Sequence, residues 1–249
     1  MKKFLSLLVT YIIIFSTFLN SANASYASSD EPSIPAEAAV LMDYETGKVL
    51  FNKNGDKKVY PASTTKAWTA YLVLKYKPNL NEKIQITKDP NVEGSSMYLK
   101  VGESFTVKEL LEGLLVHSSN DAAVVLAEYV SGSIKEFANL MNEEAKSIGA
   151  KNTHFTNPHG LPDKEHITTA NDMALMAREA MSNNVFRDIV KTKSISFPAT
   201  EAYPYERYFV NTNKFLTSNE KINYNGKDID IKYDIVDGIK TGYTDDAGR

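Results

Sequence analysis

The chain has 249 residues, no cysteine, 28 basic and 31 acidic residues, and a formal net charge of −3 at pH 7. The absence of cysteine excludes thiol chemistry and cysteine-ligated metal sites. A slightly acidic chain has no stripe of lysine and arginine side chains that could neutralise phosphates, which argues against nucleic acid as a partner.

The first 24 residues have the pattern of a signal peptide that is removed on export. Lys2 and Lys3 provide a positive start, residues 4–19 form an almost unbroken apolar run, and residues 22–24 give a small-residue cleavage site. A membrane anchor is the alternative, but the run is short for a span and polar residues follow at once. Cleavage would leave 26 basic and 31 acidic residues. We therefore expect an exported protein that acts in the cell wall or at the outer face of the cytoplasmic membrane.

A flexible lead-in and then a hairpin are predicted after the signal peptide. Residues 25–35 are polar and contain two prolines, as connecting segments often do. Apolar runs at residues 38–43 and 48–52 flank a turn sequence at residues 44–47, which predicts paired strands. We expect one domain over residues 36–249.

The segment after Pro61 is predicted to be a helix that is buried on nearly all sides. Apolar residues recur at helical spacing and occupy the other faces as well: Ala67, Trp68, Ala70, Tyr71, Leu72, Val73 and Leu74. Ser63 and Lys66 lie three residues apart at its start, so the lysine amine can reach the serine hydroxyl. A lysine whose pKa is lowered by burial or by a second cation can take the serine proton. Alone, this S-x-x-K pattern is equally well explained by a helix cap followed by a solvent-facing lysine.

The middle of the chain is predicted to be helical. Thr106 with Glu109 and Ser133 with Glu136 form capping-box patterns, and Thr169 begins a third helix. Between the first two of these helices the chain reads Ser118-Ser119-Asn120, which places a hydroxyl and an amide at a helix break. The structural alternative is a polar turn in which Asn120 caps the next helix.

Strand-like runs return from residue 191 onward, at residues 208–210 and 234–239. A strand predicted over residues 235–243 carries Lys240-Thr241-Gly242 near its end. Lysine and threonine offer a cation and a hydroxyl to a carboxylate, and glycine leaves room for another chain to lie close. An exposed strand with ordinary polar ends is the alternative. Strands, then helices, then strands indicate an α+β fold in which a sheet carries a helical insertion.

Together the three patterns are far more specific than any one, because they occur in the order that β-lactamases and penicillin-binding proteins share. Their flanks resemble the low-molecular-mass D-alanyl-D-alanine carboxypeptidases, a family of penicillin-binding serine DD-peptidases. The resemblance covers about residues 36–249, and the segments that carry it are residues 61–66, 118–123, 157–161, 168–174 and 237–244.

The resemblance implies a DD-peptidase/β-lactamase-like fold, with an antiparallel sheet flanked by helices and a helical subdomain. In the family, the K-T-G strand is followed by further strands and a long helix, and often by a second domain and an amphipathic anchor. The chain ends at Arg249, seven residues after Gly242. We therefore expect an incomplete domain that lacks the last strands and the C-terminal helix, with membrane association only through a C-terminal segment that is absent here.

The resemblance also implies a reaction, the removal of the terminal D-alanine from peptidoglycan stem peptides ending in D-Ala-D-Ala. Ser63 would attack the carbonyl between the two D-alanines, and Lys66 would take its proton, kept neutral in part by the charge of Lys240. The backbone N–H groups of Ser63 and Tyr243 would form the oxyanion hole. Water would then release the acyl-enzyme, and β-lactam antibiotics would acylate the same serine.

The remaining motif residues are expected to hold the substrate. By the same resemblance, Ser118 would pass a proton to the leaving D-alanine and Asn120 would hold the substrate amide. Lys240 and Thr241 would bind the terminal carboxylate, beside Gly242. The stem peptide would lie along the strand at residues 235–243 as an added strand.

Three other functions are weighed against this one. Class A β-lactamases add a glutamate in an E-x-x-x-N loop, and no such loop is expected between Asn120 and Lys240, which favours the carboxypeptidase. DD-endopeptidase action on cross-links stays open. A non-catalytic wall-binding fragment is also possible, although the intact Ser63 and Lys66 argue against it.

No cofactor or metal ion is expected. The histidines are His117, His154, His159 and His166, with no H-E-x-x-H pattern among them. Loop histidines more often make hydrogen bonds, and His159 is expected to brace the loop opposite the active site.

Overall fold

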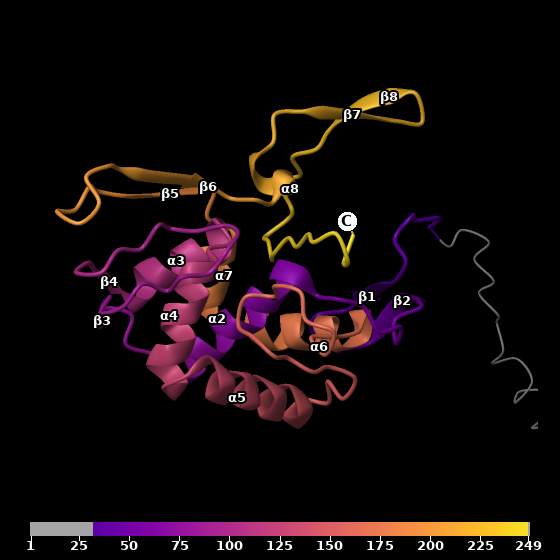
Figure 1. Ribbon diagram of the computed structural model, residues 1–249. Coiled ribbons are helices and arrows are strands. Elements are labelled where there is room, and N and C mark those ends of the chain that lie inside the picture. The colour runs from indigo at the N-terminus through magenta and orange to yellow at the C-terminus, as the bar shows by residue number, and fades with distance from the viewer. Residues whose placement is uncertain (1–31, 249) are drawn as a thin grey trace, which may run out of the picture. The chain divides into compact units, whose positions relative to one another are not determined.

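Helix α2 (Thr65–Tyr76) packs against five other helices in the computed structural model, which describes residues 32–248 (Figure 1). Its buried residues lie on all faces, as predicted: Thr65, Lys66, Ala67, Trp68, Thr69, Ala70, Leu72, Val73 and Leu74. A helix that is apolar all round is stable only inside a core. Helix α2 is therefore the element around which the others are arranged.

The predicted signal peptide and most of the predicted lead-in lie outside the described residues. From Ala36 onward the described chain forms one compact unit. The limits of the domain at residues 36 and 249 stay a prediction. No helix within residues 32–248 is long and apolar enough to cross a membrane.

Three of the helices around α2 begin where the sequence patterns predicted: α3 (Val107–Val116), α5 (Ile134–Ser147) and α6 (Ala170–Met181). No start was predicted for the other two, α4 (Asn120–Ser131) and α7 (Asn184–Val190). Thr106 and Glu109 form the full capping box at α3. The side chains of Ser133 and Thr169 accept hydrogen bonds from the third residues of α5 and α6. Each cap satisfies an N–H group that the helix itself leaves unpaired, so these residues fix the helix starts.

The described strands pair as four separate two-stranded antiparallel sheets. The pairs are β1 (Ala39–Met42) with β2 (Val49–Lys53), β3 (Lys83–Gln85) with β4 (Ser104–Thr106), β5 (Ser194–Phe197) with β6 (Arg207–Val210), and β7 (Lys221–Tyr224) with β8 (Lys227–Asp230). The first pair is the predicted hairpin, and β6 includes the predicted strand at residues 208–210. With helices between the strand pairs, the α+β class is confirmed.

The last two hairpins differ in how they join the core. In β5 and β6 every second side chain is buried, and Ile195, Phe197 and Phe209 belong to the main apolar cluster. All eight residues of β7 and β8 are exposed. The β5–β6 hairpin is therefore part of the core, and the β7–β8 hairpin is a surface element.

The predicted strand over residues 235–243, and with it the run at residues 234–239, is wrong. None of these residues lies in a strand, because no neighbouring segment pairs with them in a ladder. A strand needs a partner for its N–H and C=O groups, and a strand-like composition alone does not provide one. The segment is held instead by loop contacts, such as the hydrogen bond from Asn213 Nδ2 to the Gly238 carbonyl at 3.1 Å.

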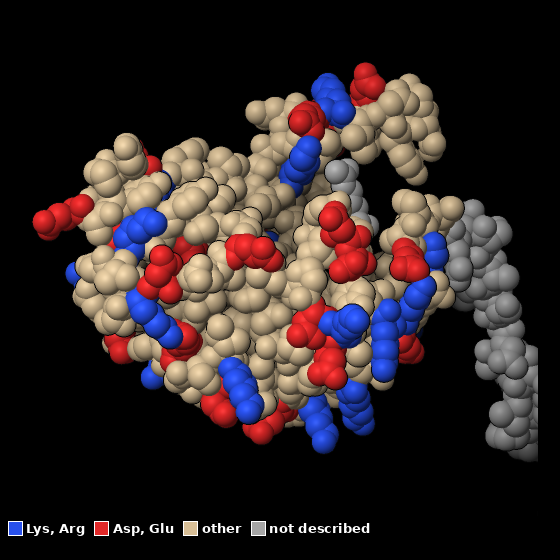
Figure 2. All heavy atoms as spheres, viewed as in Figure 1, with Lys and Arg blue, Asp and Glu red and all other residues tan. Residues whose placement is uncertain are grey.

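Charged side chains of both signs are interspersed on the face of the molecule that Figure 2 shows. This distribution fits the near balance of 28 basic and 31 acidic residues in the chain. A face with mixed charges offers no electrostatic track for a polyanion.

Candidate active site

Ser63 lies in η1 (Ala62–Thr64), a single turn of 3-10 helix that leads directly into α2. Pro61 begins the turn, and its carbonyl accepts hydrogen bonds from the backbone N–H of Thr64 at 3.2 Å and from the Thr64 hydroxyl at 2.6 Å. The turn places Ser63 at the N-terminal end of a buried helix. The free N–H groups there favour negative charge as it develops.

Lys66 Nζ lies 2.9 Å from Ser63 Oγ and 2.7 Å from the carbonyl oxygen of His159. The lysine is fully buried, at 0% exposure. Burial, and then the nearby positive charge of Lys240, hold the pKa of Lys66 well below its usual value, and the carboxylate of Asp121 opposes this shift. The amine is therefore favoured in its neutral form, in which its lone pair can accept the Ser63 proton.

The loop at residues 157–161 holds the turn that contains Ser63 in place. Gly160 has φ of +85°, and a Cβ atom there would lie 1.8 Å from the carbonyl oxygen of Ala62. Pro158 accepts a hydrogen bond from the Thr69 hydroxyl at 2.7 Å, one helical turn beyond Lys66. The loop thus contacts both η1 and α2, and only glycine fits at the closest approach.

Two buried histidines brace this region in their neutral form. Burial, and then the charge of Lys66, lower the pKa of His159 to about 3. Burial lowers the pKa of His166 to about 4. Nδ1 of His166 accepts from the backbone N–H of Thr156 at 3.0 Å, so Nε2 carries the proton and donates to the Thr65 hydroxyl at 2.9 Å. Among the described residues, no three His, Cys, Asp or Glu side chains are grouped to hold a metal ion.

The second motif forms the junction between α3 and α4. Ser118 is almost fully buried and has φ of +69°, a left-handed backbone conformation that residues other than glycine rarely adopt. Ser119 is the N-cap of α4, so the alternative in which Asn120 is the cap is wrong. Asn120 donates through Nδ2 to the Glu93 carbonyl at 2.6 Å and through its backbone N–H to the Ser95 carbonyl at 2.7 Å. No side-chain hydrogen bond joins Ser118 to Ser63 or Lys66 within residues 32–248.

Asp121, which the sequence patterns did not single out, organises the segment that faces Asn120. Its carboxylate accepts hydrogen bonds from the backbone N–H groups of Met97 at 2.9 Å and Leu99 at 3.1 Å, and from the Ser96 hydroxyl at 2.7 Å. The signal available in the sequence was an acidic residue in the first turn of a helix. A carboxylate there often accepts backbone N–H groups.

A buried ion pair secures the same segment from the other side. Arg207 of β6 and Glu103 lie 2.7 Å apart, and their side chains are 1% and 0% exposed. Nε of Arg207 also donates to the Met97 carbonyl at 2.7 Å. Residues 96–103 are therefore held between α4 and the β5–β6 hairpin, which fixes the surroundings of Asn120.

The third motif lies beside the first. Burial lowers the pKa of Lys240 to about 7, and its Nζ donates to the Thr241 carbonyl at 2.8 Å. A Cβ atom on Gly242 would lie 3.1 Å from the backbone nitrogen of Ser63, so the glycine allows the segment to approach the turn that contains Ser63. The Thr241 hydroxyl is hydrogen bonded to the Thr212 hydroxyl at 2.7 Å. Tyr243 is exposed, and its hydroxyl donates to Asp245 at 3.0 Å.

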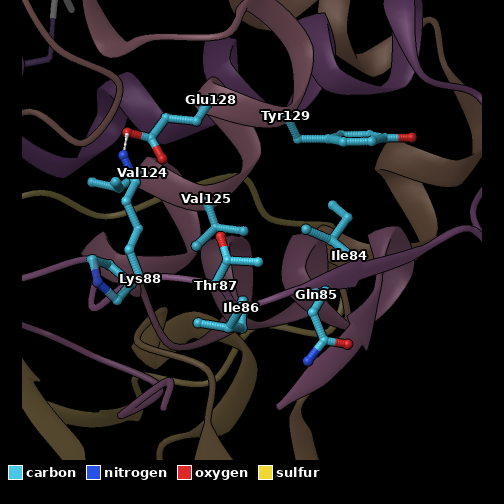
Figure 3. Close-up of a pocket in the computed structure, with 10 residues that line it drawn as sticks. Ile84, Gln85, Ile86, Thr87, Lys88, Val124, Val125, Glu128 and Tyr129 are labelled. Carbon is cyan, nitrogen blue, oxygen red and sulfur yellow. Dashed lines mark hydrogen bonds and ion pairs between the residues drawn. The ribbon is translucent and has the colours of Figure 1, made fainter. Parts of the chain in front are cut away.

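Figure 3 shows a cavity of about 170 Å³ between residues 84–90 and helix α4. Its lining is mainly apolar, and the ion pair between Lys88 and Glu128, 2.7 Å long, lies at its edge. None of the residues of the three motifs lines it. It offers no serine with an adjacent base, so it is not the candidate catalytic site.

The expectation that no E-x-x-x-N pattern lies between Asn120 and Lys240 is wrong, because the spacing occurs at Glu179 and Asn183. Glu179 lies on α6 and accepts a hydrogen bond from the Tyr71 hydroxyl at 2.7 Å. The side chain of Asn183 caps α7. Both residues have structural partners, so the spacing is not the catalytic loop of class A β-lactamases.

The comparisons with known proteins decide the family. The sequence model of the D-alanyl-D-alanine carboxypeptidases, peptidase family S11, matches residues 25–249. The chain belongs to the D-alanyl-D-alanine carboxypeptidase family. It is 39% identical to the carboxypeptidase DacF of Bacillus subtilis over 99% of this chain and 61% of that protein, and 38% identical to DacC of Escherichia coli over 93% and 56%. The chain thus spans about three fifths of the length of these family members.

Solved structures in the family confirm the DD-peptidase fold. A D-alanyl-D-alanine carboxypeptidase from Mycobacterium tuberculosis superposes with a TM-score of 0.75 at 32% identity, over 90% of this chain and 78% of that one. The carboxypeptidase DacD from Francisella tularensis gives a TM-score of 0.73 at 32% identity, over 88% and 62%. The fold expected from the motifs is therefore the fold of the family.

Proposed function

We propose that the protein is a serine D-Ala-D-Ala carboxypeptidase, which removes the terminal D-alanine from peptidoglycan stem peptides through an acyl-enzyme on Ser63. The observation that carries the proposal is the distance of 2.9 Å between Ser63 Oγ and Lys66 Nζ. The pair is buried and lies beside a second lysine that lowers the pKa of the first. A hydroxyl becomes a nucleophile only when a positioned base removes its proton, and this lysine meets that requirement.

In the proposed acylation step, Ser63 Oγ attacks the carbonyl carbon of the scissile amide while Lys66 Nζ takes the hydroxyl proton. The resulting oxyanion is stabilised by the backbone N–H groups of Ser63 and Tyr243. The C–N bond then breaks, and the leaving D-alanine receives a proton by way of Ser118. Water attacks the ester, which frees Ser63 and the shortened stem peptide.

In the proposed substrate complex, Asn120 holds the amide of the stem peptide, and Lys240 and Thr241 hold the terminal carboxylate. Gly242 supports this arrangement, since its lack of a side chain lets the carboxylate site lie next to the Ser63 turn. A β-lactam carries an amide carbonyl and a carboxylate at similar positions. It would therefore acylate Ser63 and leave slowly.

Intact-mass measurement after incubation with benzylpenicillin tests the nucleophile. One penicilloyl adduct per chain is expected, and Ser63→Ala should carry none, because the variant lacks the hydroxyl that lies 2.9 Å from the buried Lys66 amine. A persistent adduct on the Ser63→Ala variant would show that Ser63 is not the nucleophile.

A second assay tests the reaction. Release of D-alanine from a pentapeptide that ends in D-Ala-D-Ala is expected from the unmodified protein. Rapid hydrolysis of penicillin without a lasting adduct would instead indicate a β-lactamase. An adduct without D-alanine release would indicate that the stem pentapeptide is not the substrate.

We also propose export through a signal peptide that is cleaved after Ala24, with function in the cell wall or at the outer face of the cytoplasmic membrane. The apolar run behind two lysines and the small residues at the cleavage site support this. Sequencing the N-terminus of the secreted protein should give Ser25 as the first residue, and an uncleaved Met1 would contradict the proposal.

A further inference from the structure

Residues 211–213, between β6 and α8 (Lys214–Thr217), contact residues 237–243, called the K-T-G segment here, at two points. The hydroxyls of Thr212 and Thr241 are 2.7 Å apart. Nδ2 of Asn213 donates to the carbonyl of Gly238 at 3.1 Å. Since the K-T-G segment has no strand partner within residues 32–248, these hydrogen bonds are among the contacts that fix its position.

The same three residues are anchored firmly to the core. Asn211 and Asn213 are 5% and 6% exposed. Nδ2 of Asn211 donates to the carbonyls of Val190 at 3.2 Å and Thr192 at 2.8 Å. The backbone N–H of Thr212 donates to the carbonyl of Val116 at 3.3 Å, at the last residue of α3.

Val116 lies two residues before Ser118, so residues 211–213 connect the second motif to the third. A displacement of this connector would move Thr241 relative to Ser118. Sequence patterns did not reveal the connection, because residues 211–213 match neither motif and lie far from both along the chain.

Either hydroxyl of the pair can be the donor. A threonine hydroxyl has one proton to donate and lone pairs to accept with. If Thr212 donates to Thr241, the single proton of Thr241 is free to point at a carboxylate. A hydrogen bond that a hydroxyl accepts also strengthens the one it donates.

We propose that Thr212 is a positioning residue for the substrate carboxylate. Its hydroxyl orients that of Thr241, and residues 211–213 transmit the position of α3 to the K-T-G segment. The proposal rests on the proposed function, in which Thr241 binds the carboxylate. Thr212 itself acts through Thr241.

The test compares acylation by benzylpenicillin with acylation by its methyl ester, which lacks the carboxylate charge. In Thr212→Val the rate constant for the acid should fall about tenfold, the effect expected for one hydrogen bond to a charged group. The rate constant for the ester should change less than about twofold. Thr212→Ser should restore the rate for the acid, because serine keeps the hydroxyl. Thr46→Val is the matched control, since its hydroxyl also bonds a side chain, Asp43, but in the turn between β1 and β2.

Each outcome has a defined meaning. The positioning role would be overturned if the ratio of the acylation rate constants for benzylpenicillin and its methyl ester were the same in Thr212→Val as in the unmodified protein. Equal losses with both compounds would also overturn it, because they would show a general structural defect. If the unmodified protein reacts with neither compound, the proposed function itself fails, which is a different result from an unchanged ratio.

Discussion

Lys66 is buried against Ser63, so its protonation state decides what the pair can do. Arginine at this position keeps the positive charge but cannot give up its proton at accessible pH. We therefore expect Lys66→Arg to lose acylation by benzylpenicillin nearly as fully as Lys66→Ala, by about 10²–10⁴-fold, the usual contribution of a general base. Quenched-flow acylation followed by mass measurement gives the rates.

Lys75 offers a control for this substitution on the same helix. Its side chain is 42% exposed and forms an ion pair with Glu144 at 2.7 Å. Lys75→Arg should acylate like the unmodified protein, because a surface ion pair accepts either cation. Acylation of Lys66→Arg at close to the normal rate would show that lysine is not the base.

In the proposed reaction, Lys66 acts in its neutral form and Lys240 in its charged form, so the two lysines favour opposite directions of pH. Lys66 must be neutral, and since its pKa is lowered, its active fraction increases as pH rises. Lys240 must be charged to bind a carboxylate, and with a pKa of about 7 it loses that charge as pH rises above 7. Acylation by benzylpenicillin should therefore have a bell-shaped pH profile whose falling limb lies near pH 7.

The Lys240→Arg variant tests which lysine causes which limb of the pH profile. Arginine stays charged, so the falling limb should move to higher pH while the rising limb stays in place. Acylation rates measured from about pH 5 to pH 10 test this. A falling limb that stays near pH 7 in the arginine variant would assign it to another group.

At the level of residues, the sequence revealed what is local. Ser63 and Lys66 lie three positions apart, and helical spacing alone brings them together. Asp121 and Thr212 escaped notice because their partners, residues 96–99 and Thr241, are distant in the chain. When the role of a side chain depends on a residue far away in the chain, the sequence around that side chain does not reveal the role.

Gly160 connects two elements, the loop at residues 157–161 and η1. Alanine there would place Cβ 1.8 Å from the Ala62 carbonyl, in a backbone conformation with φ of +85°. We expect Gly160→Ala to destabilise the fold by roughly 3 kcal/mol, since strain from φ and the steric clash add. Urea unfolding measures the loss, and acylation by benzylpenicillin should fall with it because the turn that holds Ser63 shifts.

Gly149 is the matched control. Its φ is +93°, but a Cβ atom there would meet nothing within 4 Å. Gly149→Ala should therefore cost only about 1 kcal/mol, the strain of the backbone alone. Equal losses for the two variants would show that the contact with Ala62 is not what requires glycine at position 160.

Helices were predicted better than strands for a physical reason. A capped helix satisfies its hydrogen bonds within one stretch of chain, so Thr106 with Glu109 was sufficient to place a helix start. A strand depends on a partner elsewhere. The strand-like run at residues 235–243 has none among the described residues, so its composition gave a wrong prediction.

Over the whole molecule, the order of the three motifs indicated the fold better than any single element did. Ser63, Ser118 and Lys240 are separated by stretches of 54 and 121 residues, yet the positive charge of Lys240 acts on Lys66 in the folded protein. Spacing alone does not predict that proximity. The family resemblance provided it, because a shared order of motifs implies a shared way of closing the chain around one site.

Stability should be distributed unevenly over the molecule, and two hairpins allow a test. All residues of β7 and β8 are exposed, and the backbone N–H of Ile231 donates to the Glu220 carbonyl at 3.1 Å, which closes the base of the hairpin. Replacing residues 221–230 by Asn-Gly, a two-residue turn sequence, should leave the melting temperature within about 2 °C and keep penicillin acylation.

The same shortening applied to the β5–β6 hairpin, across residues 194–210, should have the opposite effect. It would remove Ile195, Phe197 and Phe209 from the core, together with Arg207, the partner of the buried Glu103. Each buried apolar side chain contributes roughly 1.5–3 kcal/mol, and a domain is stable by only about 5–15 kcal/mol. An unpaired buried carboxylate costs about 3–5 kcal/mol more. Thermal unfolding of this variant should show no cooperative transition, whereas a loss of cooperativity in the β7–β8 variant would mean that the exposed hairpin carries part of the core after all.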